Sequence, residues 1–581
     1  MAKSNKIIEK KELILLFVII LQCVFIALLF AFKKEGYHSD EIWNYGFANS
    51  TDGEHIYTQN GEEKNCYEWL DSKILLEYLS VDKTEIFAYG SIYNNCANDI
   101  NPPFQNMLLH LICSFFPNVW SRWFCFIVNI ISFIITQIFL YKTIKIITDD
   151  KSLSLIGVLF FGFCAGAVNI TIFLRIYALG VSFAMMYTYY STKIYKESRG
   201  VKDYIKLFIV GFLGAMTIHM FLIISFAITL MYSLNYLFRK KYKKMFAYGM
   251  TAILFVLCSV LAFPSTITHL TTKDTAYNAG KLSLFYQISK YFEYISTDII
   301  GIHNFANPTM IESIASLMIG LLLLVIFIVF YINRRKDKYI KFKNLVISYL
   351  QKIITILKKF GYPVIALFFS FLIYLIITSK MSSVGTMGEY SRRYAFLSYP
   401  LFACVVLILV KSVILPFENK IKNLNFAVLI VVVLLILLSH IFSDKAFYFK
   451  EKREGSSFDD IEKNADCIVV LDSAWLFTCA TNELYDTDKF YLAERSDYEQ
   501  DNYDTLEKSK NPVYLLLDVS NEYTGDEDDE DAKRVAKING SMTDKQDILN
   551  YYKNLSISSG CVFEGCDYLF GRKIEIYKLT P

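Results

Sequence analysis

The sequence predicts a polytopic, all-α membrane protein that carries a smaller α/β domain at its C-terminal end. Of the 581 residues, 54% are hydrophobic, which is more than a water-soluble chain of this length usually carries. Apolar runs close to the ~20 residues that cross a bilayer recur between residues 13 and 443. After Asp444, short β-type runs alternate with polar stretches instead. These three observations set the fold class.

The apolar runs predict about eleven transmembrane helices. They cover residues 13–32, 122–141, 152–170, 176–192, 204–218, 220–237, 246–263, 311–332, 361–379, 395–414 and 425–443. The first run follows a lysine-rich start, is too long for the apolar core of a signal peptide, and lacks a small-residue cleavage site. We therefore expect it to be a retained signal anchor.

The charges of the loops predict the orientation in the membrane. Lysines and arginines cluster after the second, fourth, sixth and eighth predicted spans, and the alternate loops carry far fewer. Because loops rich in Lys and Arg stay in the cytoplasm, the N-terminus is predicted to be cytoplasmic, and an odd number of spans then places the C-terminal region outside. We expect a multi-pass protein of the cell membrane, surrounded by membrane lipids.

Two domains are predicted. Residues 1–443 form the transmembrane domain, which includes a long, acidic first external loop at about 33–103. Residues 444–581 form an extracytoplasmic α/β domain, whose β-type runs are 467–472, 512–518 and 573–577. A lysine-rich apolar stretch at 338–358 predicts a cytoplasmic interfacial helix. Six consecutive acids from Asp526 to Asp531 indicate a solvated loop, and their spacing is not that of an EF-hand.

Charge and cysteine content exclude some classes of function. The net charge of +3 is close to neutral, which argues against a nucleic-acid partner. None of the twelve cysteines forms a CxxC motif, so a structural zinc site is not predicted. Disulfides among the cysteines of the predicted external regions stay open, since the sequence does not determine pairing.

Two adjacent carboxylates, Asp40 and Glu41, follow the first predicted span at its outer end. The aromatic residues Tyr37, Trp43 and Tyr45 flank them, as is typical of a membrane interface. Carboxylates beside apolar surface lose water, which raises their basicity, and two neighbours are not comfortably ionised together. Such a pair is suited to taking a proton from the hydroxyl of a sugar or a protein. A polar start of a loop, without chemistry, is the alternative interpretation.

The first external loop closes with a double proline and a short apolar stretch. Pro102 and Pro103 end regular structure and begin a new helix. At ~13 residues this helix is too short to cross a bilayer, so we expect a re-entrant or interfacial helix that carries His110. Asp99 and His110 are candidates for a second acid or for acceptor contact, and a hydrogen-bonded structural histidine is the alternative for His110.

Three motifs occur together in this order and at this predicted topology. They are the Asp40-Glu41 pair, the Pro102-Pro103-Phe104 stretch that leads into Leu-Leu-His at 108–110, and Arg175-Ile-Tyr177-Ala-Leu. Together they resemble the GT-C superfamily of polyprenyl-phosphate-sugar-dependent glycosyltransferases, which includes protein O-mannosyltransferases, aminoarabinose transferases of lipid A and the Rgt-like family. The resemblance covers about residues 13–443. The family usually has His-Pro-Pro-Leu-Tyr-Tyr where this chain has Asn-Pro-Pro-Phe-Gln-Asn at 101–106.

The resemblance implies an enzyme that takes a sugar from a polyprenyl-phosphate donor on the outer face. It gives the sugar to an acceptor hydroxyl of a cell-envelope glycan, lipid or protein in one inverting displacement. In this scheme Asp40 is the base that receives the acceptor proton, and Glu41 supports its orientation. Tyr177 is a further candidate for acceptor contact or for the second acid. The leaving phosphate is already anionic, so it needs cationic partners more than an acid.

Four residues are candidates for binding the donor phosphate. Arg175 falls at the outer end of a predicted span, where a charge is costly and often functional. His219 lies in the turn of a hairpin that barely provides two crossings, which holds it near the outer surface. Arg392 and Arg393 precede the tenth predicted span on the outer side, against the inside-positive bias. The alternatives are a snorkelling Arg175, a turn His219, and a salt bridge from the arginine pair to Glu389.

No metal site is predicted. Some members of the superfamily use a divalent cation held by carboxylates, and others do not. Asp40, Glu41 and Asp99 offer oxygen ligands, but their separation in sequence sets no coordination geometry. A divalent cation stays an open alternative.

Two other classes of function compete with the transferase. A multi-pass transporter or flippase of lipid-linked saccharides explains the many spans, but not the acidic external loop or the external arginines. Transporters also tend to carry mid-membrane polar residues and internal repeats, which are not evident here. A sensor anchored by its spans is the third interpretation, and it predicts that Asp40 is dispensable.

Overall fold

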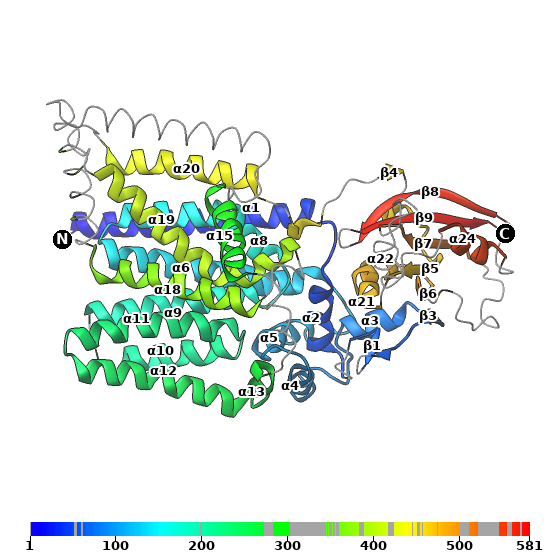
Figure 1. Cartoon of the computed structure of the whole chain (residues 1–581), viewed down its shortest axis with the longest axis horizontal. Helices are drawn as coiled ribbons and strands as arrows, with labels where there is room; N and C mark the ends of the chain where they lie inside the picture. Colours follow the sequence, from blue (N-terminus) through cyan, green and yellow to red (C-terminus); the bar gives the residue numbers. More distant parts are fainter. Residues whose placement is uncertain are drawn as a thin grey trace. The chain divides into compact units, whose positions relative to one another are not determined.

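The computed structural model divides into two compact units (Figure 1). Unit 1 comprises Met1–Leu28 and Val128–Ala446, and unit 2 comprises Leu29–Ile127 and Phe447–Pro581. The predicted domain boundary at 443–444 lies close to the start of the second segment of unit 2. Unit 2 also takes in residues 29–127, which contain the predicted first external loop.

The structure describes residues 2–51, 55–59, 62–197, 200–271, 283–302, 344, 347, 351, 355, 360–382, 388–415, 423–443, 446–449, 454–455, 457–472, 474–496, 498, 511–520, 545–554, 560–569 and 572–580. The predicted span at 311–332, almost all of the predicted interfacial helix at 338–358 and the acidic run at 526–531 lie outside these residues.

Unit 1 is helical. Its helices are α1 (Ala2–Lys33) and α6 (Arg122–Thr148), which both continue into unit 2, α7 (Lys151–Phe163), α8 (Ala165–Ile172), α9 (Tyr177–Glu197), α10 (Val201–Ala215), α11 (Met220–Phe238), α12 (Tyr242–Ala262), α13 (Ser265–Thr271), α15 (Leu284–Ile300), α18 (Tyr362–Met381), the 3₁₀ segment η1 (Gly388–Ser398), α19 (Tyr399–Ile414) and α20 (Leu424–Phe442).

Seven helices in the described part of the chain are long and apolar enough to cross a membrane, or eight if the bent pair α7–α8 is one span. The prediction of a polytopic helical membrane protein is confirmed, but its count of about eleven spans exceeds this number. The predicted span at 204–218 corresponds to α10, which has 15 residues and is shorter than a bilayer requires. The predicted span at 176–192 corresponds to α9, whose polar content is too high for a span of this kind.

Neighbouring helices compensate for the polar content of α9. In Figure 1, α9, α10, α11 and α12 run side by side. Tyr187 and Thr229 share a hydrogen bond of 2.7 Å, and Thr192 and Tyr232 share one of 2.8 Å. These hydroxyls are satisfied inside the helix group, so α9 needs less apolar surface than a helix that faces lipid.

Unit 2 contains a seven-stranded mixed sheet in the order β3-β6-β5-β7-β9-β8-β4. Its strands are β3 (Trp69–Asp71), β4 (Glu454–Gly455), β5 (Asp466–Leu471), β6 (Lys489–Glu494), β7 (Val513–Asp518), β8 (Gly560–Leu569) and β9 (Arg572–Thr580). The predicted runs at 467–472, 512–518 and 573–577 are β5, β7 and β9. The apolar strands β5 and β7 are buried along their whole length, as expected for central parallel strands.

The predicted first external loop and the short segment after it supply an edge strand and four helices to unit 2. Strand β3 pairs antiparallel with β6, although 420 positions separate Trp69 from Lys489. The helices are α2 (Ser39–Asn49), α3 (Lys73–Leu79), α4 (Tyr89–Asn98) and α5 (Phe104–Cys113). Helix α5 confirms the short helix predicted after the double proline, and it is not among the candidate spans.

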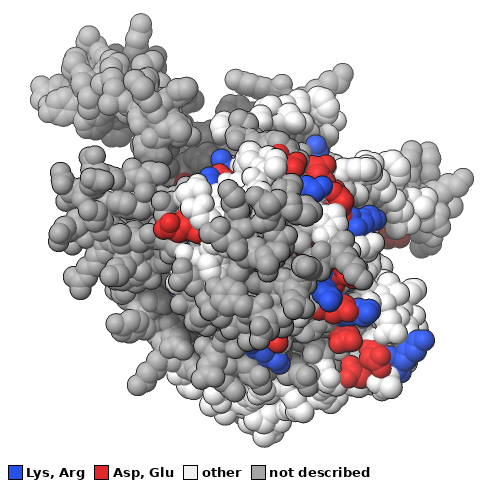
Figure 2. Space-filling model, turned by 90° about the vertical axis from the view of Figure 1, so that its right-hand side faces the viewer, with Lys and Arg blue, Asp and Glu red and all other residues white. Residues whose placement is uncertain are grey.

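Charged side chains on the described surface alternate in sign. In the view of Figure 2, Lys and Arg lie beside Asp and Glu in small clusters. This agrees with the near-neutral net charge. Among the described residues, Cys113, Cys164, Cys404, Cys467 and Cys479 are buried free thiols.

Candidate functional site

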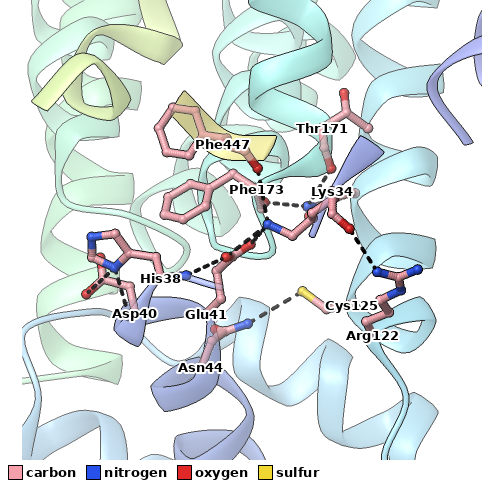
Figure 3. Close-up of polar contacts among 11 residues, drawn as sticks. Lys34, His38, Asp40, Glu41, Asn44, Arg122, Cys125, Thr171, Phe173 and Phe447 are labelled. Carbon is pink, nitrogen blue, oxygen red and sulfur yellow. Dashed lines mark hydrogen bonds and ion pairs between the residues drawn. The ribbon is translucent and has the colours of Figure 1, made fainter. Parts of the chain in front are cut away.

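A buried ion pair fixes the start of α2 in unit 2. The ammonium of Lys34 lies 2.9 Å and 3.0 Å from the two carboxylate oxygens of Glu41, and both side chains are 0% exposed. Lys34 also donates to the carbonyl of Phe447 at 3.3 Å (Figure 3). Its ammonium lies 4.8 Å from the ring centroid of Phe449. Burial lowers the pKa of Lys34 and the charge of Glu41 opposes this shift. The negative charge of Glu41 is therefore balanced by the ammonium of Lys34, so Glu41 does not compete with Asp40 for a proton.

A reciprocal cap sets the direction of Asp40. His38 is the N-cap of α2, and its Nδ1 accepts the backbone N–H of Asp40 at 3.0 Å. Glu41 Oε2 accepts the backbone N–H of His38 at 2.9 Å, so the two side chains close a capping box. Because Nδ1 is the acceptor here, the neutral form of His38 fits this geometry.

Asp40 itself lies in the first turn of α2, with 14% of its side chain exposed. Its Oδ1 is 3.8 Å from His38 Nδ1. The positive end of a helix dipole favours the ionised carboxylate at this position. The local structure thus presents a partly exposed carboxylate in the capped first turn of α2, a position that suits a general base.

Asp99 and His110 lie in the same unit as Asp40 and serve other contacts. His110 is buried in α5, and its Nδ1 lies 2.8 Å from the carbonyl of Ala48 near the end of α2. Burial lowers the pKa of His110. Asp99 follows α4, and its Oδ2 accepts from Asn101 at 3.0 Å. The geometry of His110 corresponds to the structural alternative, because it joins α5 to α2.

The C-terminal part of unit 2 packs against α2. Trp43 Nε1 donates to Thr478 Oγ1 at 3.2 Å, and helix α22 (Thr481–Leu484) follows shortly after. The residue Glu483 as a whole is partly buried. Its Oε2 atom is fully buried and has no hydrogen-bond partner. Burial, and then the negative charge of Asp567, raise the pKa of Glu483 to about 8.

This shift predicts a pH dependence of stability. In the unfolded chain Glu483 loses its proton near its ordinary pKa, whereas the folded chain keeps the proton up to about pH 8. The free energy of unfolding should therefore fall as pH rises from about 5 to 8, by at most about 1.4 kcal/mol per pH unit. All five tryptophans lie in unit 2, so intrinsic tryptophan fluorescence during thermal unfolding measures that unit. Glu483→Gln should flatten the slope, and Glu68→Gln should leave it unchanged. An equal slope in wild type and Glu483→Gln would refute this assignment.

In unit 1, Arg392 belongs to a fully buried polar cluster centred on Asp298 of α15. Arg392 Nη1 donates to Asp298 at 2.9 Å, and both side chains are 0% exposed. Tyr399, Ser443 and Asn169 also donate to this carboxylate, at 2.9, 2.6 and 3.4 Å. The charge of Arg392 is thus balanced inside the unit. The alternative partner Glu389 lies outside the described side chains.

The remaining donor-phosphate candidates gather in one region of unit 1. Tyr177, two residues after Arg175, packs edge to face on Phe396 of η1 with ring centroids 5.8 Å apart. Gly180 is close enough to Ile218 and Leu397 that a Cβ atom there would lie 2.8 Å and 3.5 Å from their methyl groups. Helix α9, the turn before α11 and η1 therefore meet. Arg175 lies two residues before α9, His219 lies in the turn, and Arg393 lies in η1.

Each of these three residues is largely buried. Arg175 and Arg393 are 6% and 2% exposed, and Arg393 Nη2 lies 3.3 Å from the hydroxyl of Tyr394. His219 Nε2 lies 3.3 Å from His269 Nδ1. Burial, with His269 beside it, lowers the pKa of His219 to about 4. His219 is therefore neutral near pH 7, so it offers a hydrogen bond and not a charge.

The predicted oxygen ligands do not fit a divalent cation. Both carboxylate oxygens of Glu41 are taken by Lys34, and Asp99 accepts from Asn101. Within the described ranges, no group of three or more His, Cys, Asp or Glu residues is placed to hold a metal ion.

Sequence reasoning missed Lys34, Asp298 and Glu483. The spacing of His38 and Glu41 is that of a capping box with histidine in the cap position. This pattern was a readable signal for the N-terminal start of α2. Asp298 is an isolated acid near the end of an amphipathic helix, where a buried cationic partner is the usual reason for a charge. Nothing in the sequence pairs Lys34 with Glu41, since many residues in this region are charged.

Part of the chain matches a known protein family, and two solved structures are similar to the chain. Residues 101–263 match the family model of dolichyl-phosphate-mannose-protein mannosyltransferases. The solved structure of ArnT from Cupriavidus metallidurans bound to undecaprenyl phosphate is similar at 7% identity and a TM-score of 0.43, covering 97% of each chain. The archaeal oligosaccharyltransferase AglB from Archaeoglobus fulgidus, in complex with an inhibitory peptide and a dolichol-phosphate, is similar at 11% identity and a TM-score of 0.43, over 87% of this chain and 70% of that one. No curated protein sequence matches the chain.

The family match agrees with the predicted resemblance over residues 101–263. It covers the double-proline segment, the Arg175–Tyr177 motif and His219. It also favours the enzyme over the transporter and sensor alternatives.

Proposed function

We propose that this chain, a membrane glycosyltransferase of the dolichyl-phosphate-mannose-protein mannosyltransferase family, transfers a sugar from a polyprenyl-phosphate donor to an acceptor hydroxyl in one inverting displacement. The reaction takes place on the extracytoplasmic face, and the acceptor belongs to the cell envelope. The observation that carries the proposal is the arrangement at the start of α2, where a partly exposed Asp40 is held by a buried ion pair and a capping box.

In the proposed step, Asp40 takes the proton of the acceptor hydroxyl as its oxygen attacks the anomeric carbon. The new carbon–oxygen bond forms on the face opposite the phosphate, and the bond from the anomeric carbon to the phosphate oxygen breaks. The polyprenyl phosphate leaves as an anion, so no proton donor is required for it. A single attack from the opposite face inverts the anomeric configuration.

Glu41, Lys34 and His38 are positioning residues in this proposal. Glu41 joins the backbone of His38 to the ammonium of Lys34, and His38 holds the backbone of Asp40. Together they fix the orientation of the first turn of α2 about the helix axis. This fixed geometry lets the carboxylate meet the acceptor without reorganising.

Arg175, Arg393 and His219 are the proposed partners of the donor phosphate. Two guanidinium groups offer charge-assisted hydrogen bonds to phosphate oxygens, and the neutral His219 adds a donor. Arg392, committed to Asp298, positions the segment that carries Arg393.

The test uses the full-length protein in proteoliposomes with undecaprenyl-phosphate and dolichyl-phosphate derivatives of mannose, glucose and aminoarabinose. We expect one donor to be consumed with release of polyprenyl phosphate, and proton NMR of the product to show the inverted anomer. Failure to consume any donor in the presence of envelope acceptors would reject the proposed transfer. A product with retained configuration would reject the single displacement.

A further inference from the structure

A cleft of about 580 Å³ lies in unit 2, and residues between Ser50 and Asn118 form its lining. Its volume falls in the range of small-molecule sites, roughly 300–1,000 Å³. Polar groups reach it from separate segments, among them Thr51 after α2, His55 and Asn65 around the β1–β2 hairpin (Thr58–Gln59 and Glu62–Glu63), and Glu77 on α3. Neither the function nor the family match assigns a role to this cleft.

The charges of the cleft favour an uncharged ligand that is rich in hydroxyl groups. The lining contains two lysines, Lys64 and Lys73, and three acids, Glu77, Asp82 and Glu85, which leaves one net negative charge. A polyanion would be repelled by the three acids. Hydroxyl groups both donate to carboxylates and accept from ammonium and amide groups, so a sugar satisfies a lining of mixed sign.

One face of α2 leads from the cleft to Asp40. Asp40, Trp43, Phe47 and Ser50 are spaced at i, i+3, i+7 and i+10, which places them on the same side of a helix. His55, from the cleft lining, packs at a tilt of 53° against Trp43, with ring centroids 4.3 Å apart, and edge to face against the buried Phe47 at 5.3 Å. The half-buried indole of Trp43 offers a flat surface of the kind that packs against sugar rings.

The cleft and α2 form one rigid frame. Tyr78 of the cleft packs so closely on Gly46 of α2 that a Cβ atom at Gly46 would lie 1.9 Å from its ring. Asn49 donates to the carbonyl of Leu79 at 2.6 Å, and Asn95 donates to the carbonyl of Ser50 at 2.7 Å. The distance between the cleft and Asp40 is therefore fixed by the helix.

That distance sets the length of the ligand. Ten helical residues from Asp40 to Ser50 span roughly 15 Å at 1.5 Å per residue. A single sugar ring is much shorter than this. A ligand that fills the cleft while its end hydroxyl reaches Asp40 must consist of several linked units.

We propose that the cleft binds the non-reacting units of an oligosaccharide acceptor, whose terminal hydroxyl extends along α2 to Asp40. This inference rests on the proposed function, because it assigns the acceptor of the same reaction. The enzyme then acts on a chain of about three or more sugar units and not on a free monosaccharide. A peptide acceptor is the competing outcome of the test.

The probes are neutral glycans released from the envelope of the producing cell by mild acid and fractionated by length, and peptides of matched length from its envelope proteins. Equilibrium dialysis with the full-length protein measures their affinity, and quenching of tryptophan fluorescence reports contact with unit 2. We expect glycans of about three or more units to bind at least tenfold more tightly than monosaccharides. Binding of peptides alone, of glycans without dependence on length, or of neither probe overturns the proposal.

Variants separate the cleft from the chemistry. Thr51→Trp places a large side chain at an exposed position of the lining and should weaken glycan binding at least about tenfold, as expected for the loss of several contacts. Glu68→Trp, exposed in the same unit and outside the lining, should bind as wild type does. Equal binding by Thr51→Trp and wild type contradicts the site. If donor is consumed but glycans do not bind, the cleft proposal fails alone. If long glycans bind but no donor is consumed, the proposed transfer fails instead.

Discussion

Asp40→Asn is expected to lower the rate of sugar transfer by about 10²–10⁴-fold, the usual contribution of a general base. The amide keeps the size of the side chain and loses the lone-pair basicity that takes the acceptor proton. The cap of α2 uses the backbone N–H of Asp40 and not its carboxylate, so the fold should be retained. Initial rates of transfer at saturating donor measure the effect, together with the unfolding temperature of the variant.

Two controls make this result interpretable. Glu68→Gln removes a carboxylate from an exposed position of the same unit and should keep the wild-type rate. Because the lost interaction belongs to the transition state, kcat should fall while the KM for the donor changes little. Transfer by a normally folded Asp40→Asn protein at the wild-type rate would remove Asp40 from the mechanism.

Lys34→Met should lower the free energy of unfolding of unit 2 by about 3–5 kcal/mol, since it leaves the buried carboxylate of Glu41 without its cation. The double variant Lys34→Met/Glu41→Gln should recover much of this loss, because no buried charge is left unpaired. Lys73→Met is the matched control, since its ion pair with Asp71 is 79% and 53% exposed and such pairs contribute roughly 0–1 kcal/mol. Denaturant unfolding followed by tryptophan fluorescence checks all three.

The transfer rate adds a second readout for the same ion pair. If Lys34 and Glu41 position Asp40, the double variant should stay folded and yet transfer sugar more slowly than wild type. A double variant as unstable as Lys34→Met would contradict the pairing. A stable double variant with wild-type kcat would limit Lys34 and Glu41 to a structural role.

The hydropathy of the chain predicted its helical membrane architecture well, because long apolar runs have few alternatives to crossing a bilayer. Within the described residues it counted two more spans, α9 and α10, than there are helices or bent pairs long and apolar enough to cross a bilayer. The hydroxyl groups of α9 hydrogen-bond to the facing helices, and this information is absent from any window of α9 alone. The β-type runs after Asp444 predicted three strands correctly. Strand β3 was missed because its partner β6 lies more than 400 residues away.

The candidate site was predictable in part for similar reasons. Asp40 and Glu41 stand out because two acids follow an apolar span, and local sequence also encodes their capping box. The sequence suggested that Asp40 and Glu41 compete for protons, whereas in the structure Glu41 forms a buried ion pair with Lys34. The sequence predicted that Arg392 binds the donor phosphate, whereas in the structure Arg392 pairs with Asp298 in a buried cluster. Both pairings depend on long-range or loop geometry, which residue spacing does not determine.

The most direct test of the central claim is a cryo-EM structure of the full-length protein with a non-transferable phosphonate analogue of its polyprenyl-phosphate sugar and an acceptor glycan. The account predicts that the Asp40 carboxylate lies within about 3 Å, or one water molecule, of the acceptor hydroxyl that faces the anomeric carbon. An acceptor hydroxyl held at the anomeric carbon by another base, with Asp40 out of reach, would contradict it.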